Sequence, residues 1–121
     1  MWVMTSIGFF SIVQKPENRA SGELTVRARV RTDLEALKSH LPSLGPIRDH
    51  AGTDYPFRAQ APQAAVAEAL SRLVAAIDYA NFKNEVAGRQ GHHRADVYGD
   101  VWSVLTDLER RPSPARSGSR S

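Results

Sequence analysis

Basic and apolar residues alternate along residues 24–31 of this chain, LTVRARVR. Alternate side chains of a β-strand point to opposite faces, so this spacing places Arg27, Arg29 and Arg31 together on one face. The guanidinium group of arginine donates hydrogen bonds in a planar fork that fits phosphate and carboxylate oxygens. The pattern therefore indicates a basic sheet face that could bind an anionic ligand.

Two further residues are expected beside these arginines. Tyr55 and Arg58 lie in a strand predicted at residues 55–61, which we expect to be a parallel neighbour of the first. Aromatic rings that stack on bases and guanidinium groups that hold phosphates are what an open sheet needs to bind single-stranded nucleic acid. Two other hypotheses stay open: the arginines pair with acids on neighbouring strands, or a second subunit covers them. The acidic candidates are Glu23, Asp49 and Asp54.

A second candidate anion site lies nearer the C-terminus. Residues 78–83, DYANFK, could begin a helix whose free backbone N–H groups bind a phosphate or carboxylate together with Lys83. Arg94 would add a donor if the two helices of this region pack together. In the alternative interpretation, Asp78 only caps the helix and Lys83 stays solvated.

The chain lacks the residue patterns of common catalytic and metal sites. It has no cysteine, and it contains no Gly-x-Ser-x-Gly, Walker or His-Glu-x-x-His motif. The neighbouring His92 and His93 would point about 100° apart on a helix, so they would rarely share a metal ion. We therefore expect no catalytic residue, no metal site and no cofactor, and an enzyme acting on a small molecule ranks third among the functions.

The positive charge of the chain is concentrated at its C-terminal end. Four of the sixteen Lys and Arg residues lie in residues 110–121, which contain no acidic residue. Residues 1–109 therefore hold twelve basic and thirteen acidic side chains, and a nucleic-acid partner is not favoured because this part has no overall positive field. We expect a single domain over residues 1–109 and a disordered basic tail over residues 110–121.

The order of the expected elements indicates an α+β fold. Strands are predicted at residues 2–15, 24–31, 47–50 and 55–61, with a helix after the second strand that begins at Thr32 in a Thr-Asp-Leu-Glu capping box. Further helices are predicted at residues 62–77, 79–89 and 93–109. This ββαββα order predicts a permuted ferredoxin-like sheet of four strands in the order 1-2-4-3, with the helices on one face and two further C-terminal helices.

The first predicted strand is apolar on both of its faces. Val3 and Phe9 lie on one face, and Trp2 and Met4 lie on the other. Only one face can belong to the core, so the other needs a cover. The leading hypothesis is therefore a small non-catalytic interaction module that forms a homodimer, or binds another protein, through its sheet face. Nucleic-acid or phosphate-ligand binding on the arginine face is the alternative.

In the last helix, Trp102 is expected to be buried.

The N-terminal segment is apolar without the features of a secretion signal or a membrane span. It lacks a basic leader and a small-residue cleavage site, and Thr5, Ser6 and Ser11 interrupt its apolar run. Together with the absence of cysteine, these features favour a cytoplasmic protein without a membrane partner.

Four segments of the chain are distinctive as a set: WVMTSIGFFSIVQKP, LTVRARVRTDLEAL, AGTDYPFRA and DYANFKNEVAGRQGHHRADVYGDVWSVL. Together they resemble a family of small bacterial proteins that has no assigned function. The resemblance covers about residues 2–108 and excludes the tail. It implies a complete, self-standing bacterial domain, and it implies no activity, cofactor or site residue.

Overall fold

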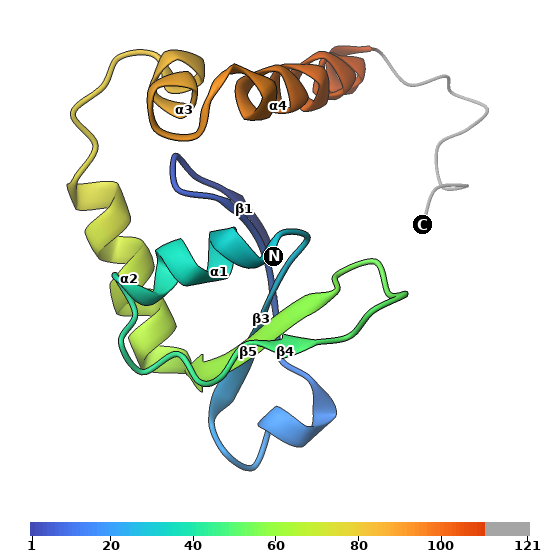
Figure 1. Ribbon diagram of the computed structural model, residues 1–121, viewed down its shortest axis with the longest axis vertical. Coiled ribbons are helices and arrows are strands. Elements are labelled where there is room, and N and C mark those ends of the chain that lie inside the picture. The colour runs from blue at the N-terminus through green and yellow to red at the C-terminus, as the bar shows by residue number, and fades with distance from the viewer. Residues whose placement is uncertain (111–121) are drawn as a thin grey trace. The chain divides into compact units, whose positions relative to one another are not determined.

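The computed structural model describes residues 1–110 of the chain (Figure 1). The contacts between residues divide the chain into unit 1, Met1–Ala80, and unit 2, which begins at Asn81. Unit 1 contains β1 (Trp2–Met4), β2 (Phe9–Val13), the 3-10 helix η1 (Pro16–Asn18), β3 (Glu23–Ala28), α1 (Arg31–Lys38), β4 (Arg48–Asp49), β5 (Phe57–Pro62) and α2 (Gln63–Ala75). Unit 2 contains α3 (Phe82–Gln90), α4 (His92–Leu105) and the 3-10 helix η2 (Thr106–Glu109). Apart from Arg110, the tail expected at residues 110–121 lies outside the described residues.

Unit 1 is built on an open antiparallel sheet of five strands in the order β1-β2-β3-β5-β4. The α+β class is therefore confirmed, whereas the predicted count of four strands is wrong. Residues 2–15, predicted as one strand, form the two strands β1 and β2, which pair as a hairpin. Thr5 stabilises the turn between them, because its hydroxyl donates to the carbonyl oxygen of Gly8 and accepts from the N–H groups of Ile7 and Gly8.

Gly8 lies where α1 approaches the β1–β2 turn. A Cβ atom at this position would stand 2.7 Å from Cγ of Asp33, a buried residue in the first turn of α1. Oδ2 of Asp33 accepts a hydrogen bond of 3.1 Å from the backbone N–H of Phe9. Only glycine fits beneath this carboxylate, and the hydrogen bond ties the start of β2 to α1.

The core of unit 1 lies between one face of the sheet and the helices α1 and α2. Both helices contact β3 and β5 (Figure 1). Alternate strand residues point into this core, as the period of two requires. The buried strand residues are Phe10, Ile12, Val26, Ala28, Ala59 and Ala61, and the buried helix residues are Leu34, Leu37, Val66 and Ala69. Leu34, Leu37 and Leu41, which recur at helical spacing in the sequence, are all buried.

The predicted start of the first helix is wrong. Helix α1 begins at Arg31 after Val30, and no side chain caps it, so Thr32 lies inside its first turn. Glu35, expected to reach back to the helix start, instead accepts a hydrogen bond of 3.2 Å from Nε of Arg31. Arg31 therefore belongs to the helix and not to the strand before it.

The predicted cap of α3 is also wrong. Helix α3 begins at Phe82, and its N-cap is Asn81, not Asp78. Oδ1 of Asn81 accepts a hydrogen bond of 2.9 Å from the backbone N–H of Asn84, and the Asn81 backbone is extended, as an N-cap requires.

Unit 2 is a helical hairpin with a small core. Val86, Ala95 and Tyr98 are buried, and the rings of Phe82 and Tyr98 stack with centroids 5.9 Å apart. Phe82 opens α3 and stacks on Tyr98, so the first turn of α3 lies beside the middle of α4, where the second half of α4 begins. Trp102 lies in that half and is 71% exposed, so the prediction that Trp102 is buried is wrong.

Candidate anion-binding site

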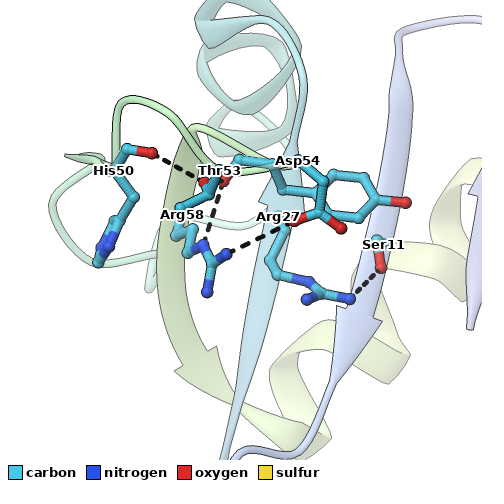
Figure 2. A network of polar contacts seen from close by, with 7 residues as sticks. Ser11, Arg27, His50, Thr53, Asp54 and Arg58 are labelled. Atoms are coloured by element: carbon cyan, nitrogen blue, oxygen red, sulfur yellow. Dashed lines mark hydrogen bonds and ion pairs between the residues drawn. The ribbon is translucent and has the colours of Figure 1, made fainter.

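The face of the sheet opposite the core, here called the open face, carries three arginines side by side. Directly opposed residues of antiparallel strands point to the same face. In this sheet Arg27 of β3 is opposed to Arg58 of β5, and Arg58 is opposed to Arg48 of β4. These three residues are the cross-strand arginines, and Figure 2 shows two of them, Arg27 and Arg58, projecting next to each other.

The arginine row therefore runs across the strands and not along one of them. Strand β3 ends at Ala28, so of the predicted set only Arg27 lies in the strand. Arg29 follows the strand end, and Arg31 lies in α1. The neighbour that carries Arg58 is antiparallel, so the expectation of a parallel neighbour is wrong.

Tyr55 lies against two arginines and is buried, with 3% of its surface exposed. The Cζ atoms of Arg27 and Arg29 are 4.6 and 4.9 Å from the centroid of its ring, within the range of a cation–π contact. Nη2 of Arg27 also donates a hydrogen bond of 2.7 Å to Oγ of Ser11 on β2 (Figure 2). Within the described residues, Nε of Arg27 is buried without a hydrogen-bond partner. Arg27 is therefore held mainly by the ring and by one hydroxyl.

The loop between β4 and β5 fixes the position of Arg58. The hydroxyl of Thr53 lies 2.8 Å from the carbonyl oxygen of His50 and 3.0 Å from that of Tyr55, which closes the turn. Gly52 supplies the left-handed backbone that this turn needs, with φ of 87°. Nε of Arg58 donates a hydrogen bond of 3.1 Å to the carbonyl oxygen of Tyr55. The guanidinium of Arg58 is thus oriented before any ligand binds.

A hollow of about 290 Å³ lies beside Arg48 and Arg58. Its lining includes Arg48, Arg58 and His50, here called the β4 side, and Lys15, Glu17 and Glu23, here called the η1 side, because the sheet register separates Glu23 from Arg58 by four residues along the strands. Thr25 and Gln60, which are opposed in the β3–β5 ladder, lie between the two sides. The sequence patterns did not point to Arg48 or His50, because the two-residue strand β4 is too short for a local periodicity, nor to Lys15 or Glu17, which lie at and before η1 outside any strand.

Few acidic side chains lie close enough to the cross-strand arginines to neutralise their charge. Of the three predicted acidic partners, only Asp54 lies within ion-pair distance among the described residues, with Oδ1 4.0 Å from Nη2 of Arg58 (Figure 2). Asp49 is opposed to Phe57, so it points to the other face. Arg48 makes no side-chain hydrogen bond or ion pair with residues 1–110. The β4 side of the hollow therefore keeps a positive charge.

The other predicted anion site lies in unit 2. Lys83 is exposed in the first turn of α3, and its Nζ lies 3.7 Å from the point where a Cβ atom of Gly99 would stand. Nη1 of Arg94 donates a hydrogen bond of 3.3 Å to the hydroxyl of Tyr98. Both residues belong to the helical hairpin, whereas Arg27, Tyr55 and Arg58 come together in unit 1.

Comparison with known proteins finds no match for this chain among protein-family models, curated proteins or solved structures. Residues 1–110 contain no group of three or more His, Cys, Asp or Glu side chains placed to hold a metal ion. Over the same residues, no helix combines the length and apolar character that a membrane crossing requires. The chemistry of the site therefore has to be argued from its own geometry.

Proposed function

We propose that unit 1 is a small binding module that holds the phosphate or carboxylate group of a ligand in the hollow on its open face. The observation that carries this proposal is the opposition of Arg48 and Arg58 in one ladder, at one hollow, with a single acid at the limit of ion-pair distance. Like charges directly opposed on neighbouring strands destabilise a sheet. An anion between them would convert this repulsion into two charge-assisted contacts.

The two arginines suit different parts of this task. The side chain of Arg58 is 18% exposed, and the loop orients it, so an anion at this group would meet a partly desolvated charge. Arg48 is exposed and unpaired within residues 1–110, so it can move toward the ligand at little cost. His50, at the same side of the hollow, would add a further hydrogen-bond donor.

Titration of the full-length protein with inorganic phosphate and with ethyl phosphate, followed by calorimetry, tests the proposal. We expect saturable binding that weakens with added salt. Arg48→Gln should weaken it about tenfold or more, since a hydrogen bond to a charged group contributes roughly 1.5–3 kcal/mol. Arg31→Gln is the control, because Arg31 is also exposed but lies on α1. Equal affinities for the wild-type protein and both variants would contradict the proposal.

A second candidate function is self-association through the open face. Trp2 is opposed to Ser11 on this face, is 73% exposed and packs edge-on against Phe9 with ring centroids 5.9 Å apart. An exposed tryptophan on a sheet face is a common anchor for a protein partner. If this candidate is correct, light scattering should detect a dimer of the wild-type protein at micromolar concentration and a monomer of Trp2→Gln. A monomeric wild-type protein would argue against it.

For the fold, we propose the permuted ferredoxin-like description. It is supported by the strand order β2-β3-β5-β4 and by the packing of α1 and α2 on one face, with β1 as an additional edge strand. Hydrogen exchange tests it: amides of β2, β3 and β5 should be more protected than those of β1 and β4, because each of these three strands has two neighbours.

A further inference from the structure

The hollow on the open face carries opposite charges on its two sides. Arg48 and Arg58 lie on the β4 side, and Glu17 and Glu23 lie on the η1 side. Glu17 and Glu23 form no ion pair with any residue of the described chain, and the same is true of Arg48. The charges therefore face each other across the hollow without neutralising one another.

The register of the sheet explains why the two sides stay apart. Glu23 is opposed to Pro62, whereas Arg58 lies four residues earlier on β5. Four residues of a strand span about 13 Å, so the backbone positions of Glu23 and Arg58 are separated by roughly this length. Their side chains extend over the hollow, and the polar pair Thr25 and Gln60 lies between them.

The acidic side of the hollow is fixed to the sheet. Oδ1 of the buried Asn18 accepts hydrogen bonds from Oγ1 of Thr25, at 2.7 Å, and from the backbone N–H of Lys15, at 3.0 Å. These bonds tie η1 to β3 and hold Glu17 at the rim. One lysine and two glutamates on this side leave one negative charge, since Lys15 offsets only one carboxylate.

Resting on the proposed function, we infer that the ligand is a small zwitterionic molecule. Its phosphate or carboxylate group lies at Arg48 and Arg58, and its amino group lies at Glu17 and Glu23. Polar atoms between the two groups face Thr25 and Gln60. The volume of about 290 Å³ is near the lower end of the range for small-molecule sites, about 300–1,000 Å³, which suits a compact amino phosphate or amino acid.

Matched pairs of phosphates test this inference on the full-length protein. The probes are 2-aminoethyl phosphate and 4-aminobutyl phosphate, each compared by calorimetry with the alkyl phosphate of the same length that lacks the amino group. We expect at least one amino phosphate to bind about tenfold more tightly than its alkyl partner. The double variant Glu17→Gln/Glu23→Gln should lose this preference and keep the affinity for the alkyl phosphate. Glu35→Gln/Glu68→Gln, on the exposed sides of α1 and α2, is the control and should keep the preference.

The outcomes separate the two proposals. If amino and alkyl phosphates bind with equal affinity, the zwitterionic ligand is excluded while the anion site stands. A preference that survives in Glu17→Gln/Glu23→Gln would also overturn the inference, because the amino group would then be held elsewhere. If no phosphate binds at all, the anion site fails together with the inference drawn from it.

Discussion

Replacement of Tyr55 by leucine should lower the free energy of unfolding, because two arginines rest on its ring. Tyr55 is buried, and the guanidinium groups of Arg27 and Arg29 lie 4.6 and 4.9 Å from the ring centroid. Leucine keeps an apolar side chain at this position but offers no π face to a cation. Tyr55→Leu therefore removes the cation–π attraction while it keeps much of the burial.

The two contacts should differ in strength. Arg27 is half-buried, and its Nε is shielded from solvent without a hydrogen-bond partner in the described residues, so its contact belongs near the upper value of about 2 kcal/mol. Arg29 is exposed, and a contact of this kind contributes about 0.5–1 kcal/mol. The sum, between 2 and 3 kcal/mol as an order of magnitude, should lower the Tm by on the order of 10 °C in a domain of this size.

A double-mutant cycle in urea, followed by circular dichroism, measures these contacts directly. The coupling between Tyr55→Leu and Arg27→Met should be about 1–2 kcal/mol, and that between Tyr55→Leu and Arg29→Met should be about half as large. Arg31→Met is the control, and its effect should add to that of Tyr55→Leu within roughly 0.5 kcal/mol. A coupling for Arg27 as small as that of the control would refute the reasoning, because Arg27 would then not be held by the ring.

Three further substitutions test other parts of the fold by urea denaturation. Gly8→Ala should destabilise unit 1 by roughly 1–3 kcal/mol, because the added Cβ atom would stand 2.7 Å from Cγ of Asp33. An unchanged urea midpoint would show that the β1–β2 turn and α1 do not approach so closely. Asn81→Ala should cost about 1 kcal/mol and lower the helical signal, since α3 loses its N-cap bond, whereas Asp78→Ala should have little effect. Trp102→Ala should change the free energy of unfolding by less than about 0.5 kcal/mol, because this side chain is exposed, and a much larger loss would show that a partner covers it.

The periodic patterns predicted which residues are buried better than they predicted where elements begin. Leu34, Leu37 and Val66 belong to apolar stripes with helical spacing and lie in the core, because such a stripe identifies an apolar face directly. The fold-back at Thr5–Gly8 was missed, although Thr5, Ser6 and Gly8 interrupt the apolar run, because three such residues do not by themselves distinguish a turn from a continuous strand. That turn depends on one hydroxyl and on the approach of Asp33, a contact that local sequence does not reveal.

Helix α4 shows the limit of the same reasoning. The stripe that includes Val97, Val101 and Trp102 has helical spacing, and all three side chains are exposed. Periodicity identifies an apolar face but does not reveal which element covers it. In unit 2, α3 begins beside Tyr98, so Val101 and Trp102 continue the stripe beyond the helix that would bury them, and Val97 is exposed although it lies next to Tyr98.

Strand geometry explains why only part of the candidate site was predicted from the sequence. Alternation within each strand was enough to give Arg27 and Arg58 their orientations, but the partner residue Arg48 depends on a register that only the folded sheet defines. Alternate residues along one strand are about 6.6 Å apart, whereas opposed residues on neighbouring strands are only about 5 Å apart. Opposed arginines therefore repel one another more strongly than arginines along a strand do.

This repulsion is offset unevenly across the sheet. Arg27 has the ring of Tyr55 and the hydroxyl of Ser11, and Arg58 has a carbonyl oxygen and the distant Asp54. Within residues 1–110, Arg48 has no such compensation. The first two arginines thus contribute to the folded structure itself, whereas the third gains most when an anion enters the hollow. Substitution of Arg27 should consequently lower the free energy of unfolding. Substitution of Arg48 should lower the affinity for the anion and leave the free energy of unfolding unchanged.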